Sequence, residues 1–431
     1  MNSKGFSLFP FVLFIILFIL SGLIYNDFYA ISSVFWMLLV LFVTFITFKG
    51  TFNDKLQALF TGFADKNILT MCIIFLLSGA FTSLAKSLGA IEYISYLLLE
   101  YVPSSYFLIV VFILACVLSF SLGTSVGTII ALAPIIYELG QADTETLVLL
   151  AGGLLGGAMF GDNLSFISDT TIAATQTMEV RMIDKFKANG LLAGLAGIIT
   201  VFLLSFYDFN GNIVNLKSVN TSWWVLLPYM ILLVLAFCGW HVVKVLSIAV
   251  LSSFVLLFID MPDLVKHAST IMDGIQNMFE IVVLSLLIGG LVQLIKEQGG
   301  IDWLIEKLHQ IIQKSKDKVP FVLTLLTSLI NAAVANNTIA LMIVGPIANK
   351  ISTKYDMDKP RMTSLIDIVS CVTQGLLPYG AQVLILVTLL ENQVDYLQLV
   401  THSFYIWSLF LVTFLSFVFL SQKKSKPQDV D

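Results

Sequence analysis

The stretch LLAGGLLGGAMFGDNLSFISDTT, residues 149 to 171, decides the fold class of this chain. A glycine-rich apolar run leads directly into two aspartates, Asp162 and Asp169, with hydroxyl side chains around them. An ionisable residue inside a membrane segment is costly and marks a functional site by default. A helix is interrupted at membrane depth only where protein or a water-filled cavity satisfies the freed backbone groups. The stretch therefore predicts a membrane-spanning helix that breaks at a functional centre.

The composition of the whole chain agrees with a membrane protein. Of its 431 residues, 58% are hydrophobic and 12% are charged, and the mean hydropathy is +0.93. Apolar runs of about 20 residues recur from end to end, and each is long enough to cross a hydrocarbon core as a helix. Soluble enzymes and nucleic-acid-binding proteins are therefore excluded. The sequence contains no nucleophile–base pair, metal-ligand cluster or cofactor motif, so we expect neither enzymatic activity nor a cofactor.

Hydropathy predicts an all-α polytopic fold with about ten transmembrane spans and two re-entrant hairpins. Four segments are too long for one crossing and carry polar or Gly/Pro-rich interruptions at their centres. We interpret 104–139 and 319–350 as the hairpins, and 146–178 and 361–391 as full crossings that are broken in the middle. The other predicted spans are 7–25, 30–48, 67–86, 188–206, 222–240, 244–259, 277–296 and 399–420.

The two halves of the chain are related in sequence. SGAFTSLAKSLGAI at 78–91 matches IGGLVQLIKEQGGI at 288–301, an offset of 210 residues. Residues 1–206 and 222–420 then hold five crossings each, and this odd number inserts the second half upside down relative to the first. Inverted repeats with paired broken helices are the architecture of secondary transporters.

The distribution of charge predicts the orientation of the chain. Cationic residues gather in loops on one predicted side, so the positive-inside rule makes both termini and the 421–431 tail cytoplasmic. Interfacial helices such as 87–101 can serve as scaffold contacts, which leaves a homodimer open. The cations that we assign to the cytoplasmic loops of the first half are Lys49, Lys55, Lys66, Arg181, Lys185 and Lys187.

The polar break at the centre of 146–178 predicts a sodium site. If the helix unwinds between Asp162 and Asp169, both carboxylates and the neighbouring hydroxyls converge, and oxygen ligands of these kinds suit a hard cation such as Na⁺. The alternative is that the aspartates cap two half-helices. For the tip of the first hairpin, the alternative to ion binding is tight helix packing. The predicted ligands are Asp162, Asn163, Ser165, Ser168, Asp169 and Thr170, with Thr124 and Ser125 at that tip.

A second polar centre lies in the second half of the chain and is rich in amides. Neutral amides and half-helix ends suit a dipolar or anionic solute, or a second cation through carbonyl oxygens. The remaining buried acid, Asp367, either handles protons or forms a plain ion pair. The residues predicted for this substrate or second-ion site are Asn336, Asn337, Thr338, Thr373, Gln374 and Pro378.

Two motifs carry a resemblance to a known family. GDNLSFISDTT at 161–171 resembles the signature GDxxSPxSDTT of NhaC-type sodium/proton antiporters, and QGLLPYGAQ at 374–382 is similar to the later P-[WY]-G break of that family. The resemblance implies two hairpins and two broken helices around the site, in a multi-pass protein of the bacterial cell (inner) membrane. Phe166 stands at the position of the motif proline, so we expect the break to come from Gly161 and the hydroxyl residues.

Two functions remain open on the sequence. The first is Na⁺/H⁺ antiport, in which the two cations compete for the oxygens of one site by alternating access. The second is Na⁺- or H⁺-coupled transport of an amino acid or small organic acid, with the cation at the aspartates and the solute at the amides. The first motif favours antiport, and the neutral second centre favours coupled transport.

Overall fold

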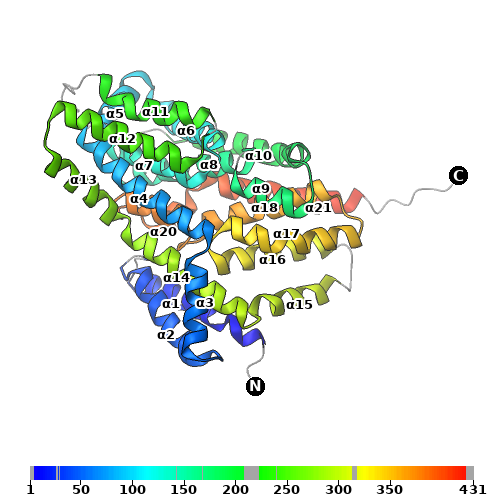
Figure 1. Ribbon diagram of the computed structural model, residues 1–431. Helices are drawn as coiled ribbons and strands as arrows, with labels where there is room; N and C mark the ends of the chain where they lie inside the picture. Colours follow the sequence, from blue (N-terminus) through cyan, green and yellow to red (C-terminus); the bar gives the residue numbers. More distant parts are fainter. Residues whose placement is uncertain are drawn as a thin grey trace.

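The computed structural model describes residues 4–25, 28, 30–141, 143–166, 168–207, 223–238, 240–312 and 318–423. Helices are the only regular elements in this part of the chain (Figure 1). Within it, seven helical segments are long and apolar enough to cross a membrane, and shorter apolar helices accompany them. The prediction of an all-α polytopic membrane protein is therefore confirmed.

The helices of the first half follow each other with short connections. They are η1 (Lys4–Leu8), α1 (Phe9–Tyr25), α2 (Ser33–Thr47), α3 (Phe52–Phe63), α4 (Lys66–Ser87), α5 (Ala90–Tyr101), η2 (Ser104–Tyr106), α6 (Phe107–Leu122), α7 (Ser125–Gly140), α8 (Thr144–Leu164), α9 (Asp169–Met178) and α10 (Met182–Leu204).

The helices of the second half recur in a similar order. They are η3 (Trp223–Leu226), α11 (Leu227–Phe237), α12 (Val242–Asp260), α13 (Leu264–Asn277), α14 (Phe279–Glu297), α15 (Gly300–Ile312), α16 (Val319–Val334), α17 (Asn337–Lys354), α18 (Lys359–Leu376), α19 (Ala381–Leu389), α20 (Tyr396–Thr401) and α21 (Phe404–Lys423).

All four segments that were predicted to be interrupted consist of two helices with a short break. The breaks separate α6 from α7, α8 from α9, α16 from α17, and α18 from α19. Most predicted ordinary spans agree with a helix to within a few residues. The span predicted at 188–206 is wrong at its start, because α10 begins at Met182. The span predicted at 399–420 is divided into α20 and α21. The connection 208–222 and most of the predicted tail, 424–431, lie outside the described residues.

The two hairpin tips have the same backbone geometry. Gly123 ends α6 with φ +67° and Thr124 caps α7, while Ala335 ends α16 with φ +50° and Asn336 caps α17. The side chain of Ser119 donates to the carbonyl of Ala158, and that of Asn331 donates to the carbonyl of Ser370. Corresponding positions here are 212 residues apart, so the offset of 210 read from the sequence does not extend to the hairpin tips.

Close helix contacts through glycine also occur in matching pairs. A Cβ atom on Gly62 of α3 would overlap the backbone of Gly289 on α14, and one on Gly274 of α13 would overlap the backbone of Gly79 on α4. Figure 1 shows α3 beside α14 and α13 alongside α4, and these pairs are among those in closest contact. Glycine permits such an approach because it has no side chain in the way.

The glycine-rich run of α8 packs against the first hairpin. A Cβ atom on Gly157 would meet the carbonyl of Phe112, and one on Gly161 would meet the backbone nitrogen of Phe120. Gly161 thus lies inside α8 at a contact with α6, and the helix does not break there. This close contact brings the tip of the first hairpin to the end of α8.

Candidate functional site

A buried oxygen cluster surrounds the Asp162 carboxylate near the end of α8. Ser125 Oγ donates to Asp162 Oδ2 at 2.8 Å, and Ser168 Oγ donates to Asp162 Oδ1 at 2.5 Å. Ser168 Oγ also lies 2.7 Å from Thr170 Oγ1, and Gln382 Nε2 donates to Ser125 Oγ at 3.1 Å. All five side chains are buried. The first hairpin and the first broken helix therefore meet at one carboxylate, and Gln382 of the second broken helix contacts this cluster through Ser125.

The break between α8 and α9 forms without the proline of the family motif. Ser165 and Ser168 adopt extended backbone angles, and the Ser168 hydroxyl caps α9 by accepting from the amide of Thr170. Serine favours such caps because its hydroxyl replaces a missing backbone partner. Phe166 stacks on Phe186 with ring centroids 4.6 Å apart. The hydroxyl residues thus flank the break, as expected, whereas Gly161 lies within α8 and its carbonyl accepts from the amide of Ser165 at the end of the helix.

The two aspartates of the motif have different surroundings. Asp162 is 6% exposed, whereas Asp169 lies in the first turn of α9 and is exposed. Neither side chain caps a half-helix, since Ser168 caps α9 and the last helical residue of α8 is Leu164. Asp169 lies at the positive end of the α9 dipole, which stabilises its negative charge. Asp162 is the motif aspartate that the fold encloses.

A second charged centre lies beside the first and involves a lysine. Lys185 Nζ lies 2.7 Å from Asp367 Oδ2, and the two side chains are 2% and 1% exposed. The same ammonium donates to the Asn163 carbonyl at 2.7 Å and to Thr171 Oγ1 at 2.9 Å. The assignment of Lys185 to a cytoplasmic loop is therefore wrong. Of the two interpretations of Asp367, the ion pair is the one for which the structure contains a partner.

Asn189 extends this centre along α10. Its side-chain amide donates to the Asn163 carbonyl at 3.0 Å and contacts the Asn163 side chain, and its Oδ1 accepts from Ser364 Oγ at 3.3 Å. Lys185 and Asn189 are one helical turn apart and both face inward, whereas Leu191 and Ile198 on the same helix are exposed. Sequence reasoning missed both residues, although their i, i+4 spacing at the start of an apolar helix is a usable signal.

The second hairpin and the second broken helix form the amide-rich centre. Gln374 Nε2 donates to the carbonyl of Ala335 at 3.0 Å, and Thr373 Oγ1 donates to Ser328 Oγ at 3.2 Å. Asn336 caps α17 and accepts from the amide of Ile339 at 3.0 Å. The remaining predicted residues lie close by. Asn337 and Thr338 begin α17, and Pro378 lies in the break before α19.

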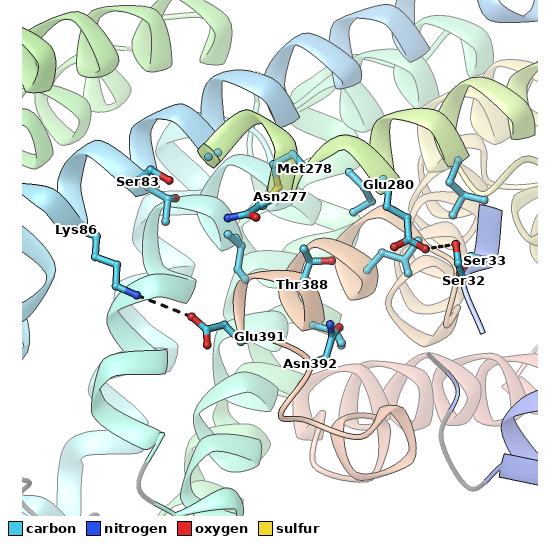
Figure 2. Close-up of a pocket in the computed structure, with 18 of the residues that line it drawn as sticks. Ser32, Ser33, Ser83, Lys86, Asn277, Met278, Glu280, Thr388, Glu391 and Asn392 are labelled. Atoms are coloured by element: carbon cyan, nitrogen blue, oxygen red, sulfur yellow. Dashed lines mark hydrogen bonds and ion pairs between the residues drawn. The ribbon is translucent and has the colours of Figure 1, made fainter. Parts of the chain in front are cut away.

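A cavity of about 540 Å³ opens between α2, α4, α14 and the end of α19 (Figure 2). Lys86 Nζ lies 3.9 Å from Glu391 Oε1 at one side, and Ser32 Oγ donates to Glu280 at the other. A smaller space at Asn336 and Tyr379 shares Ile281, Leu284 and Leu384 with the cavity wall. The cavity therefore approaches the tip of the second hairpin.

Comparison with known proteins identifies the family. The model of the Na⁺/H⁺ antiporter family matches residues 4–209 and, in a second match, 157–420. The chain belongs to this family. The resemblance to NhaC-type antiporters is thereby confirmed, and the Na⁺/H⁺ antiporter family is one of transporters and not of enzymes. The Asp162 cluster, the Lys185 pair and all four breaks lie inside the matched residues.

Three of the similar proteins are named as antiporters of different solutes. The Na(+)/H(+) antiporter NhaC of Bacillus subtilis is 22% identical over 349 residues, which are 73% of this chain and 75% of that one. The arginine/ornithine antiporter ArcD of Halobacterium salinarum is 23% identical over 363 residues, 75% of this chain and 74% of that one. The malate-2H(+)/Na(+)-lactate antiporter of Bacillus subtilis is 29% identical over 198 residues, 43% of this chain, and the chain spans 42% of its length.

Proposed function

We propose that the protein exchanges Na⁺ for H⁺ at the Asp162 carboxylate. The observation that supports this most directly is the buried oxygen cluster, in which hydroxyls from the first hairpin and from the break of α8–α9 contact one carboxylate. The single negative charge of this cluster is neutralised by one monovalent cation or by one proton, and its other oxygens are neutral. Carboxylate and hydroxyl oxygens are also the ligands that hard cations prefer.

Competition between the two cations follows from the chemistry of this carboxylate. A proton on Asp162 removes the charge that holds Na⁺, and a bound Na⁺ disfavours the proton, so the cations exclude each other. The Gln382 side-chain oxygen is buried and has no hydrogen-bond donor among the described residues. It is therefore available as a further neutral ligand when Na⁺ replaces the hydrogen bonds of the cluster.

We further propose that residues 1–206 and 222–420 form two inverted repeats that alternate access to the site. The recurring helix order, the matching hairpin tips and the reciprocal glycine contacts support this. In such transporters the site lies where the repeats meet, and one repeat rocks against the other. The proposal includes cytoplasmic termini and a bacterial inner membrane.

A second candidate is Na⁺- or H⁺-coupled transport of an amino acid or small organic acid. The cavity of about 540 Å³ favours it, because its walls carry both a lysine and two glutamates and it approaches Asn336. The names of the arginine/ornithine and malate/lactate relatives are consistent with it. In this case Na⁺ or H⁺ binds at Asp162 and the solute binds near the second hairpin.

Proteoliposomes that contain a pH-sensitive dye separate the two functions. We expect that adding Na⁺ alone outside the vesicles drives H⁺ out of proteoliposomes that contain wild-type protein. Asp162→Asn should abolish this response, because the amide is nearly isosteric and carries no charge. A response that requires an added amino acid or organic acid supports the second function, and a Na⁺ response that persists in Asp162→Asn contradicts the proposed site.

A further inference from the structure

The first broken helix presents two sets of oxygen atoms, side by side in its sequence. Asp162 and Thr170 belong to the cluster described above, while Asn163 and Thr171, the next residue in each case, contact Lys185. Helices α8 and α9, on either side of the break, thus each contribute one residue to each set. Among the described residues, the carboxylate of the first set has no ion pair, whereas the second set is occupied by the ammonium of Lys185.

The atoms around Lys185 are those that a small cation takes as ligands. They are the Asp367 carboxylate at 2.7 Å, the Asn163 main-chain carbonyl at 2.7 Å and the Thr171 hydroxyl at 2.9 Å. Carboxylate, carbonyl and hydroxyl oxygens together are a typical ligand set for a hard cation. The number of these oxygens equals the number of donors that an ammonium has. The charges of Lys185 and Asp367 also compensate each other at a position that is closed to solvent.

We propose that the ammonium of Lys185 is a resident cation that occupies a second, built-in cation site. This site is made of Asp367, Asn163 and Thr171, and it takes an alkali cation such as Na⁺ when the ammonium is removed. The proposal rests on the proposed function, because it assigns the exchange of cations to Asp162 alone and gives Asp367 a fixed counter-ion. Asn189 is a positioning residue, because it holds the Asn163 carbonyl from the same helix as Lys185.

Removal of the lysine charge tests this directly. Lys185→Met keeps most of the side-chain volume and leaves Asp367 without its counter-ion. We expect purified Lys185→Met to bind one more Na⁺ per chain than wild type in equilibrium dialysis with radioactive sodium. The double variant Lys185→Met with Asp367→Asn should return to the wild-type number, because the vacated site then lacks its charge. Lys187→Met is the matched control, since Lys187 is exposed on the same helix turn.

A buried carboxylate without a counter-ion also destabilises the fold, and this provides a second measurement. For each protein we compare the thermal unfolding temperature in Na⁺ with that in choline. We expect this difference to be larger for Lys185→Met than for wild type or the double variant. Equal Na⁺ counts in Lys185→Met and the double variant overturn the proposal. The proposal is also overturned if the yield of folded Lys185→Met is no greater in high sodium chloride than in choline chloride.

The same data keep this proposal distinct from the proposed function. If wild type binds no Na⁺ and Lys185→Met binds Na⁺ only with Asp367 present, the resident-cation proposal stands and antiport at Asp162 fails. If wild type binds and exchanges Na⁺ while Lys185→Met gains no site, the antiport proposal stands and the resident-cation proposal fails.

Discussion

Asp162 and Gln374 occupy the same position in two broken helices, 212 residues apart in the chain. Each is two residues from the end of its half-helix, before a break of four residues. Asp162 accepts from Ser125 of the first hairpin, and Gln374 donates to Ala335 of the second. The two positions thus match in backbone setting and in a hydrogen bond to the neighbouring hairpin, while one carries a carboxylate and the other an amide.

The contacts of Asp162 predict a graded effect of its neighbours. Ser125→Ala removes one hydrogen bond to a charged group, worth about 1.5 to 3 kcal/mol. We therefore expect the half-saturating Na⁺ concentration of proton exchange to rise by about tenfold or more. Ser121→Ala is the control, because Ser121 belongs to the same hairpin and its hydroxyl donates to the carbonyl of Val117 in its own helix. An unchanged Na⁺ dependence in Ser125→Ala would remove the hairpin from the site.

Asp169 is expected to matter less for equilibrium binding than Asp162. Its side chain is exposed at the start of α9, and the buried charge comes from Asp162. We predict that Asp169→Asn retains Na⁺ binding in equilibrium dialysis, whereas Asp162→Asn loses it. If Asp169→Asn loses Na⁺ binding as completely as Asp162→Asn does, then both carboxylates hold the ion, as the sequence motif suggests.

Asn337 of the second hairpin corresponds to Ser125 of the first. If the second centre binds an organic solute, Asn337→Ala should lower solute affinity by about 1 to 3 kcal/mol and leave Na⁺ binding unchanged. If the centre serves antiport, the same variant should shift the apparent Na⁺ or H⁺ affinity without any solute. Sodium isotherms measured across pH separate these cases. An unaltered isotherm together with full antiport leaves this residue a purely structural role.

The orientation of the hairpins can be tested by labelling. We predict that Glu145→Cys, beside the first hairpin, reacts with an impermeant thiol reagent from outside the cell, and that Asp356→Cys, beside the second, does not. The background is Cys238→Ser, because the other three cysteines are buried. Equal labelling of both positions from outside is incompatible with inverted repeats.

The glycine contacts predict a difference in stability. A Cβ atom on Gly79 would overlap the backbone of Gly274, whereas one on Gly194 would meet no atom within 4 Å. We expect Gly79→Ala to destabilise the fold by about 1 to 3 kcal/mol. Gly194→Ala should be neutral or stabilising by up to about 1 kcal/mol, because alanine favours a helix. Thermal unfolding in detergent measures both, and an equal effect of the two variants contradicts the close contact of α4 and α13.

Much of the candidate site could be predicted because its signals are local. Asp162, Ser125 and Ser168 lie at breaks that small and polar residues reveal inside apolar segments. Lys185 was misassigned because a lysine next to a predicted span is normally a loop cation. Its burial depends on Asp367, a residue far along the chain, and no local pattern indicates that pairing.

The sequence by itself determined the membrane class, the four interrupted segments and the family, because hydropathy, helix-breaking residues and motifs are properties of neighbouring residues. Only the tertiary structure decided which aspartate is enclosed and which lysine pairs with a buried carboxylate. The free energy of a charge inside a membrane protein depends on what surrounds it in space. For Asp162 these surroundings are Ser125 and Ser168, and for Lys185 they are Asp367 and Asn163. Of these groups only Asp367 comes from the second half of the chain, so its contact with Lys185 depends on the packing of α18 against α10.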